Sequence, residues 1–592
     1  MQSDLPRGQD APATVTTADT NSGAAQNEAK DSGGAGSHGL RSHGLGSEGS
    51  GSTGALASAV RVVSMLTLLS RFAGLARDVV TARVFGDGLL GSSFRAAYAV
   101  PNLFRRLFGE GALSAAFLPR YAMLSRDEPE MAGELSRLTL RVLTLVTSAM
   151  TLLICGALAL VLWLAPVDAD RNLSLTLMIV MLPMMPMVCL TAIMGGMLQA
   201  HGRFGPPAAA PIVLNLFQIV AAGFFLVGLI QDKVNTAYWV AAAALLASVA
   251  QVVWSVWALR GKVRWRRAGL DARAHARTVL DRFVPAALGL GTLQLNTTLD
   301  MIIAMWPVWV GATVIGFPIT LDQSSNAILS YTQTLYQFPL GVFGLAVATA
   351  VFPLLSRSAD RPREFESHLR RGVRLSLFIG LPASIGLLLV RDDIVRVLFG
   401  GGGSFSEEGL VRSGLVLAGF APAIWAYSLN HVLTRAFYAR GDTRTPMRLA
   451  IGAVGLNLTL NLTLVWHLGE SGLAWATGIT ATVQCLVLLV LTRRVLGVVA
   501  INAETRAAVS RLALASMLMG VCVWGVLELM PRGTAWWLHV VRLGVAVGVG
   551  GGAYVAFCRG LRMPELGWIM ERAPKSAGGA SGRNGAAGMS LD

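Results

Sequence analysis

Charged side chains occur inside two apolar stretches near the beginning of the sequence. Between Ser70 and Tyr121, segments apolar enough to enter a bilayer contain Arg71, Arg77, Arg83, Arg105, Arg106 and Glu110. An arginine at the middle of a bilayer costs about 2.5–3.5 kcal/mol on insertion scales, so it persists only beside a partner or a ligand. The planar guanidinium binds phosphate and carboxylate through two parallel hydrogen bonds. The pattern therefore predicts a polar cavity for an anionic substrate, with phosphate as the first expectation.

Some of these charges have structural interpretations instead. Arg106 and Glu110 are four residues apart on one predicted helix, so they could neutralise each other. Arg83 is expected near the external surface, where its long side chain can reach the interface. The substrate role is expected of the other three, Arg71, Arg77 and Arg105.

A second set of residues is rich in oxygen atoms. It comprises Asn296 and Asp300 in one apolar segment, Asn457 and Asn461 in a later one, and Thr477 in the next. One carboxylate with amide and hydroxyl oxygens suits Na⁺ or a proton, and a carboxylate in apolar sequence needs a partner. Hydrogen bonding between helices by asparagine explains the same residues, and both interpretations stay open.

The composition is typical of a membrane protein. Hydrophobic residues make up 53% of the sequence and charged residues 14%, and the mean hydropathy is +0.56. The formal net charge of +15 could suggest nucleic-acid binding, but the basic residues lie in short loops between apolar runs. Basic cytoplasmic loops explain this distribution better. We therefore predict an all-α polytopic membrane protein that binds no nucleic acid.

About fourteen apolar segments are long enough to span a bilayer. They lie near 58–84, 90–119, 138–165, 172–199, 208–230, 236–259, 279–310, 324–355, 373–390, 410–437, 447–466, 470–492, 509–530 and 536–558. The loops 260–282 and 357–374 are strongly basic, whereas the loops predicted on the other side are nearly free of basic residues. This asymmetry predicts an even number of spans with both termini in the cytoplasm.

Two sequence echoes indicate an internal repeat. AAFLPRY resembles TAVFPLLS, which relates Pro119 to Pro353 by a displacement of 234 residues, and QAHGRFGPP resembles FYARGDTRTP, which relates Pro206 to Pro446. Duplicated helix bundles with a central site at mid-membrane are the expected plan of a transporter. We therefore predict two pseudo-symmetric six-helix lobes followed by two further helices.

The predicted domain boundaries follow from this repeat and from composition. Residues 1–55 are rich in Gly, Ser, Ala and Asp without an apolar run, so they are expected to form a disordered cytoplasmic tail. The remaining divisions are a first lobe over 56–260, a second lobe over 261–498, a helix pair over 499–560 and a cytoplasmic tail over 561–592.

Several motifs together resemble those of a known family. SRFAGLARD, ARVFG, VPNLFRRLFGEGALSAAFLP, GRFGPPAAAPIVLN, QFPLGVFGLAVATAVFPLLS and FYARGDTRTP occur in this order between about 58 and 560. The chain thereby resembles the MurJ (MviN) lipid II flippases, within the multidrug/oligosaccharidyl-lipid/polysaccharide exporter superfamily. This resemblance implies no enzyme activity. It implies transport of the undecaprenyl-pyrophosphate-linked peptidoglycan precursor lipid II from the inner to the outer leaflet of the bacterial cytoplasmic membrane.

The resemblance also implies which residues bind the cargo. At the family's motif positions this sequence has Ser70, Arg71, Arg77, Asp78, Arg105 and Glu110. It further implies that the helices near 509–530 and 536–558 line a groove for the lipid tail, although an ordinary lipid-facing pair explains them equally well.

Two positions depart from the family pattern. Thr334 stands where a cavity arginine is usual, and Ser92 stands where an acid is usual, with Arg95 as an additional charge nearby. His431 and Arg435, four residues apart, could supply a compensating cation. These departures leave the exact cargo open.

The sequence also bears on the energy source of transport. No P-loop motif occurs, so the membrane potential is the expected source, with Na⁺ or proton coupling at Asp300, Asn457, Asn461 and Thr477 and no other cofactor. The five cysteines lack the spacing of a disulfide framework or zinc site.

Two alternatives to lipid II transport stay open: a drug or polysaccharide-precursor exporter, and a non-transporting scaffold. The expected partners are lipid II, the membrane and cell-wall synthesis enzymes.

Overall fold

The computed structural model describes the backbone of most of the chain. The described residues are 49–166, 168–265, 269, 277–279, 294–314 and 316–570, and their side chains are described except at 49–61, 109–112, 115, 343, 345, 569 and 570. The fold below is that of the compact unit that begins at Ala57. A short helix, α21 (Pro564–Met570), lies in the segment predicted to be the second tail.

The described chain is helical apart from one small hairpin. Its strands β1 (Thr313–Val314) and β2 (Phe317–Pro318) are antiparallel, with Thr313 opposite Pro318. Within the described residues, 11 helices are long and apolar enough to cross a membrane. Their bounds are α4 (Pro129–Leu164), α5 (Ala169–Met181) with α6 (Met184–Ala200), α7 (Gly205–Leu226), α8 (Lys233–Leu259), α11 (Ser325–Pro339) with η2 (Leu340–Gly344) and α12 (Leu345–Arg357), α13 (Pro362–Leu389), α15 (Glu407–Phe420) with η4 (Ala421–Ala423) and α16 (Ile424–Ala439), α17 (Arg444–Leu468), α18 (Glu470–Leu496), α19 (Ala503–Leu529) and α20 (Trp536–Gly560). Each matches one predicted segment, so the all-α polytopic fold is confirmed.

The three other predicted segments have a more complex structure. α1 (Gly49–Phe85) covers the first of them. The second is divided among α2 (Leu89–Phe104), the π-helix η1 (Arg105–Gly111) and α3 (Ala112–Asp127). The third is described only in part, as a helix over 294–304 followed by α10 (Trp306–Trp309). The count of fourteen spans therefore stays a prediction.

The internal repeat is visible in the local structure. The π-helix η1 interrupts the second segment, and the π-helix η2 interrupts the eighth at the matching place. A π-helix pairs residues five apart, which widens the turn and leaves a bulge. Pro119 follows η1 within α3, and Pro353 follows η2 within α12. Both segments thus have the same order of helix, π-helix and helix.

The two repeated helices α2 and α11 pack against each other. Nδ2 of Asn326 donates to the carbonyl oxygen of Ser92 at 2.8 Å, and the backbone N–H of Ala327 donates to Oγ of Ser92 at 3.0 Å. Asn326 and Ser92 are 234 residues apart, which is the displacement of the repeat. Equivalent positions of the two repeats therefore meet.

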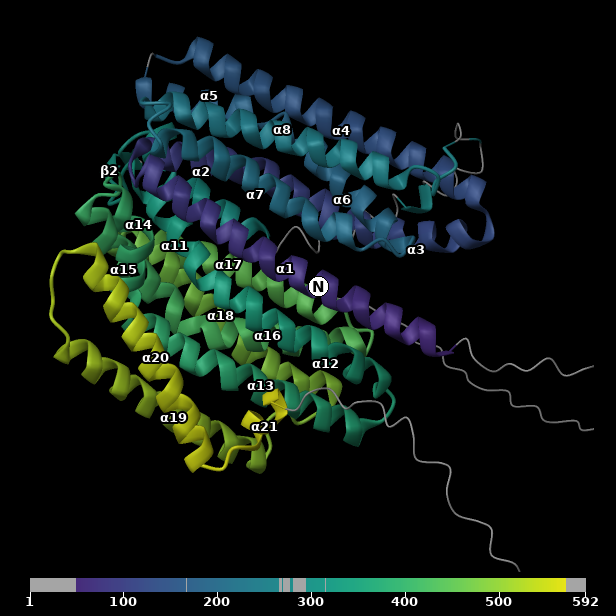
Figure 1. Ribbon diagram of the computed structural model, residues 1–592, viewed down its shortest axis with the longest axis vertical. Coiled ribbons are helices and arrows are strands. Elements are labelled where there is room, and N and C mark those ends of the chain that lie inside the picture. Colours follow the sequence, from purple (N-terminus) through teal and green to yellow (C-terminus); the bar gives the residue numbers. More distant parts are fainter. Residues whose placement is uncertain are drawn as a thin grey trace, which may run out of the picture. The chain divides into compact units, whose positions relative to one another are not determined.

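Two groups of helices lie around this contact. In one group, α7 and α6 pack on α8 and α2 packs on α5; in the other, α13 packs on α16 and α19, while α15 and α17 pack on α18. In Figure 1, α4, α5 and α8 lie on one side of α1, and α13, α16 and α18 lie on the other. The last pair, α19 and α20, pack on each other, and α20 contacts the short helix α14 (Arg391–Phe399).

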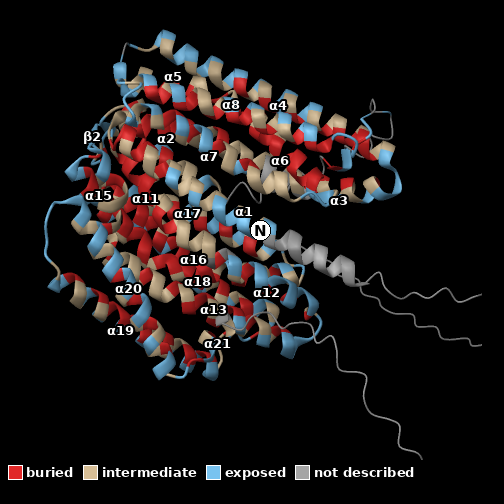
Figure 2. Ribbon diagram, viewed as in Figure 1, coloured by how far each residue is buried: buried red, intermediate tan, exposed pale blue. Residues whose placement is uncertain are grey.

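The distribution of burial fits a membrane environment. Figure 2 shows buried residues where helices face one another, with exposed residues along the outer sides of helices such as α4 and α20. On α4, the apolar side chains of Leu153 and Trp163 are 74% and 80% exposed. Large exposed apolar surfaces are rare on water-soluble monomers, whereas in a bilayer they face lipid and the helices keep their backbone groups paired. The chain is a multi-pass membrane protein.

Candidate functional site

Two adjoining cavities lie beside α1. The smaller, of about 310 Å³, is lined by α1, α2, the 294–304 helix and α11; the larger, of about 750 Å³, is lined mainly by α1, α2, η1, α6 and α7. Six residues line both cavities: Arg71, Gly74, Arg77, Tyr98, Asn102 and Arg106. The cavities therefore meet at arginines that were singled out in the sequence.

The local structure of α2 and η1 brings polar groups to this place. Pro101 lies inside α2 and has no N–H to donate to the preceding turn, and η1 begins four residues later. Nε of Arg105, the first residue of η1, donates to Oδ1 of Asn102 at 2.9 Å. The interrupted helix thus presents Asn102 and Arg105 to the larger cavity.

Arg77 is held by partners on several sides. Its guanidinium donates twice to Oδ1 of Asp78, at 3.0 and 2.7 Å, once to the hydroxyl of Tyr98 at 2.6 Å and once to Oδ1 of Asn215 at 3.0 Å. An arginine side chain has five N–H groups, and four of these are used here. Arg77 is therefore largely occupied in this conformation, and it ties α1 to α2 and α7.

Asp78 connects three helices. It is 4% exposed, and besides Arg77 it accepts from Nη1 of Arg95 at 2.9 Å and from Oγ1 of Thr334 at 2.9 Å. Nη2 of Arg95 also donates to the carbonyl oxygen of Ser330 at 3.0 Å. One buried acid shared by two arginines leaves an excess positive charge at the junction of α1, α2 and α11.

Arg71 differs from its neighbours because its guanidinium has no partner among the described residues. Within the described part of the chain it has no hydrogen-bond or ion-pair partner, and it lines both cavities. Its Nη1 lies against the backbone at Gly341 in η2. A donor fork without a partner in a cavity inside the membrane region is suited to bind an anionic ligand.

The remaining predicted cargo residues lie around the same cavities as far as they are described. Ser70 lines the larger one, and its carbonyl oxygen accepts from Nδ2 of Asn215 at 3.4 Å. Nη1 of Arg106 donates to Oε1 of Gln294 at 3.2 Å. The side chain of Glu110 lies outside the described residues, so its suggested pairing with Arg106 stays a prediction.

Arg83 binds the end of a neighbouring helix. Its Nε and Nη2 donate to the carbonyl oxygens of Leu398 at 2.9 Å and Val397 at 2.8 Å. Carbonyl oxygens at the end of a helix lack partners within that helix, so a guanidinium is a natural cap for α14. The expected position of Arg83 near the external surface concerns the bilayer and stays a prediction, whereas its contact with α14 was not foreseen from α1 alone.

The two departures from the family pattern have local structural roles. The hydroxyl of Thr334 donates to Asp78, and Ser92 accepts from the backbone of α11. His431 and Arg435, considered as compensating cations, are not among the residues that line the two cavities, whereas Arg95 is. Arg95, Tyr98, Asn102 and Arg106 recur every three or four residues, so a polar stripe along α2 was a signal that the sequence contained.

The oxygen-rich residues meet around one buried carboxylate. Nδ2 of Asn461 donates to Oδ1 of Asp300 at 2.6 Å and to Oδ1 of Asn457 at 3.2 Å. Oγ1 of Thr477 donates to Oδ2 of Asp300 at 3.3 Å, and Nδ2 of Asn457 donates to Thr477 at 3.3 Å. The structure thus brings together the four residues predicted as a cation site, while no hydrogen bond joins Asn296 to them in the described residues.

The chemistry of these residues fits a small cation. Asp300 is 3% exposed, and Oδ1 of Asn461 is buried without a hydrogen-bond partner among the described residues. Rotation of the Asn461 amide would turn this oxygen toward Asp300. Carboxylate, amide and hydroxyl oxygens are the ligands that hard cations prefer.

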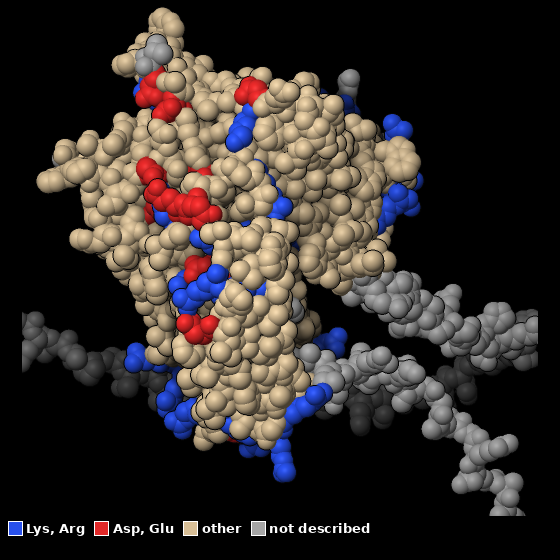
Figure 3. Space-filling view, turned by 60° about the vertical axis from the view of Figure 1, so that its left-hand side comes forward, with Lys and Arg blue, Asp and Glu red and all other residues tan. Residues whose placement is uncertain are grey.

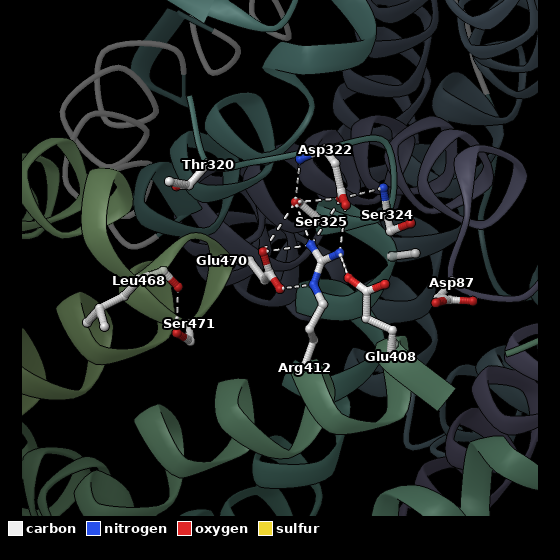
Figure 4. A network of polar contacts seen from close by, with 12 residues as sticks. Asp87, Thr320, Asp322, Ser324, Ser325, Glu408, Arg412, Leu468, Glu470 and Ser471 are labelled. Carbon is white, nitrogen blue, oxygen red and sulfur yellow. Dashed lines mark hydrogen bonds and ion pairs between the residues drawn. The ribbon is translucent and has the colours of Figure 1, made fainter. Parts of the chain in front are cut away.

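A different arginine network lies between α15, α18 and the segment before α11 (Figure 4). Arg412 is within 2.6 Å of Asp322, 2.7 Å of Glu470 and 3.6 Å of Glu408. Partial burial would raise the pKa of Asp322, but hydrogen bonds from Arg412 and its positive charge outweigh this and lower the pKa below its usual value. Sequence reasoning missed this network because its members are far apart in the chain.

Comparison with known proteins identifies the family. The family model described as "Lipid II flippase MurJ" matches residues 81–543. The chain belongs to the MurJ lipid II flippase family. Among its MurJ relatives, a probable lipid II flippase MurJ of Vibrio cholerae is 30% identical over 85% of this chain and 96% of its own length. Another, from Rhizobium tropici, is 32% identical over 72% of this chain and 78% of its own length.

Solved structures agree with the MurJ fold. A lipid II flippase MurJ in an inward closed conformation superimposes with a TM-score of 0.69 at 22% identity, covering 84% of this chain and 99% of the other. An inward-facing multidrug resistance transporter of the MATE family gives a TM-score of 0.57 at 15% identity, covering 76% and 98%. The likeness at these identities concerns the fold.

Proposed function

We propose that this protein moves lipid II from the inner to the outer leaflet of the bacterial cytoplasmic membrane by alternating access. The observation that carries this proposal is the guanidinium of Arg71, which has no partner among the described residues, in a cavity that also contains Arg77, Arg105 and Arg106. A pyrophosphate linked to a lipid is an anion that arginine forks bind well. The relatives named as lipid II flippases support this choice of cargo.

The residues of the cavity suggest the order of events. Cargo first meets Arg71, because Arg77 is engaged by Asp78, Tyr98 and Asn215. A bound anion would compete with Asp78 for Arg77 and would thereby loosen the junction of α1, α2 and α11. With the cytoplasm negative, each negative charge that moves outward gains about 2.3 kcal/mol per 100 mV across the full potential. The potential therefore drives the cargo in the required direction.

We further propose that Asp300, Asn457, Asn461 and Thr477 hold Na⁺ or a proton during the return step. When bound, either would neutralise the charge of Asp300 in the membrane. The hydrogen bonds that now reach Asp300 from Asn461 and Thr477 hold the 294–304 helix to α17 and α18. The test compares transport in Na⁺ and in choline buffers for wild type and Asp300→Asn: an equal wild-type rate in both buffers at constant pH would refute Na⁺ coupling.

The proposed orientation places both termini in the cytoplasm. On the face shown in Figure 3, Lys and Arg side chains gather along the lower end and the right-hand edge, and Asp and Glu side chains are concentrated at the upper left and centre. The positive-inside tendency assigns the basic end to the cytoplasm. The C-terminal ends of α1 and α14, and the Arg412 network, then face the outside of the cell. Labelling of single cysteines at positions 357 and 534 by a membrane-impermeant reagent tests this, because only position 534 should react in intact cells.

The function is tested by complementation. A bacterium depleted of its own lipid II flippase would express the wild type, Arg71→Ala or the control Arg532→Ala, whose arginine is 73% exposed and pairs with Glu528. Growth and externally accessible lipid II should be restored by wild type and the control but not by Arg71→Ala. Failure of a well-expressed wild type to restore external lipid II would instead favour the related exporter activity.

A further inference from the structure

The guanidinium of Arg71 lies against the backbone of η2 at Gly341. A Cβ atom at position 341 would overlap Nη1 of Arg71 and would lie 2.7 Å from its Cζ and 3.3 Å from its Nη2. Protein interiors are close-packed, and two heavy atoms cannot share this space. The arginine therefore occupies the volume that the side chain of any residue other than glycine would fill.

The surrounding structure brings α1 and η2 to this distance. The ring of Phe72, next to Arg71, packs edge-on against the ring of Phe338 near the end of α11, with centroids 5.1 Å apart. The π-helix begins two residues later, and its wider turn changes the direction of the backbone. The aromatic pair thus fixes the backbone of α1 beside η2, and Gly341 then determines where the guanidinium can lie.

Some other glycines of the bundle are crowded by a neighbouring backbone, as Gly133 is by Arg264, and others are not crowded at all. Gly452 and Gly455 of α17 have no heavy atom within 4 Å of an added Cβ. At Gly341 all three nearest atoms belong to the end of one flexible arginine side chain. An added methyl group would therefore displace the guanidinium more readily than the helix.

We propose that Gly341 is a positioning residue for Arg71. Within the described chain Arg71 has no hydrogen-bond partner, so its contact with η2 orients the donor fork in the cavities. An anion bound by Arg71 is then held at the boundary between the two groups of helices, and its affinity depends on how closely they approach. This inference rests on the proposed function only in treating Arg71 as the cargo-binding arginine.

The first experiment measures the position of the side chain without any cargo. Purified wild type, Gly341→Ala and the matched control Gly452→Ala are treated with phenylglyoxal, and modification of each arginine is followed by mass spectrometry with Arg532 as the internal reference. In Gly341→Ala the added methyl group should displace the guanidinium and change the modification rate of Arg71 several-fold. In Gly452→Ala the rate should be unchanged. An unchanged rate in Gly341→Ala would overturn the proposal.

The second experiment measures binding of a short-chain prenyl pyrophosphate to the detergent-solubilised protein. Gly341→Ala should weaken binding about tenfold, which corresponds to a charge-assisted hydrogen bond. In an Arg71→Ala background the same substitution should have no additional effect, because its action passes through Arg71. An equal loss in both backgrounds would contradict the positioning role.

The two experiments separate this inference from the proposed function. If the modification rate of Arg71 changes but the wild type binds no prenyl pyrophosphate, Gly341 positions the arginine and the proposed cargo is wrong. Thermal unfolding in detergent keeps the result interpretable, since Gly341→Ala should unfold at the temperature of the Gly452→Ala control. A marked loss of stability confined to Gly341→Ala would mean that the helix moved instead of Arg71, which also counts against the proposal.

Discussion

The Arg412 network and the two cavities differ in how completely their arginine side chains are paired with acids. Arg412 is surrounded by three acids, one of which, Glu470, is 5% exposed. In the cavities, by contrast, Arg71 has no partner among the described residues, and Arg77 and Arg95 share Asp78. A guanidinium whose donors are all matched is costly to separate from its partners, because loss of one partner leaves a buried charge uncompensated. A guanidinium left unmatched is available to a ligand.

The largest expected effect comes from removing the unmatched arginine. Arg71→Ala should lower the rate of lipid II transport by a factor of about 10–100, since hydrogen bonds to charged groups contribute about 1.5–3 kcal/mol. It should leave the thermal unfolding temperature unchanged, because the side chain has no partner to lose in the described chain. Transport assays in vesicles and unfolding in detergent measure both; a large fall in stability would contradict the comparison.

Glu470→Ala should lower stability and leave transport unchanged, which is the opposite of the effect expected for Arg71→Ala. Loss of one partner from a buried ion pair costs about 3–5 kcal/mol, and we expect the lower limit because Arg412 keeps Asp322, which is half exposed. Unfolding temperature should drop, while transport per folded molecule stays at the wild-type level. Transport lost without a loss of stability would show that the network belongs to the transport machinery.

Thr334→Val tests whether a residue that contacts Asp78, the acid shared by Arg77 and Arg95, contributes to stability or to ligand binding. The substitution removes the hydrogen bond from Thr334 to Asp78 and nearly preserves the side-chain volume, so we expect a stability loss of about 1 kcal/mol. Asp78 keeps Arg77 and Arg95, and binding of prenyl pyrophosphate should be retained. A loss of binding as large as that of Arg71→Ala would instead place Thr334 in the ligand site.

Glu408→Ala should have the smallest effect. Its carboxylate is 80% exposed and lies 3.6 Å from Arg412, and exposed pairs contribute about 0–1 kcal/mol. Unfolding temperature and transport should both match the wild type. Because Glu408 and Glu470 contact the same guanidinium, a destabilisation equal to that of Glu470→Ala would show that burial does not determine the strength of this network.

The sequence predicted the helical fold and the place of the cavity because both have local signals. Arg71 and Arg77 were recognisable as charges in apolar surroundings, and Asp300 was recognisable in the same way. The partners of these charges were not predictable. Arg95 meets Ser330 across 235 residues, and this contact requires α2 and α11 to pack together.

The same limit explains what was missed. The partners of Arg83 were missed because the carbonyl oxygens at the end of α14, more than 300 residues away in sequence, are invisible from its own helix. Gly341 was one of 65 glycines, and only the position of Arg71 distinguishes it. Patterns along a helix show which face is polar, whereas the tertiary structure decides which charges become neutralised.

The contact between Ser92 and Asn326 has a practical consequence for spectroscopy. Since equivalent positions of the two repeats touch there, any approximate two-fold axis that relates them passes close to this point. Probes near an axis of rotation change their separation little as the two repeats rock, whereas probes at the far ends of α3 and α12 sweep the longest arcs. Spin-label pairs at those ends should therefore give broad or multiple distance distributions in a transporting sample, and a pair beside Ser92 and Asn326 should give a single narrow one that serves as the internal standard.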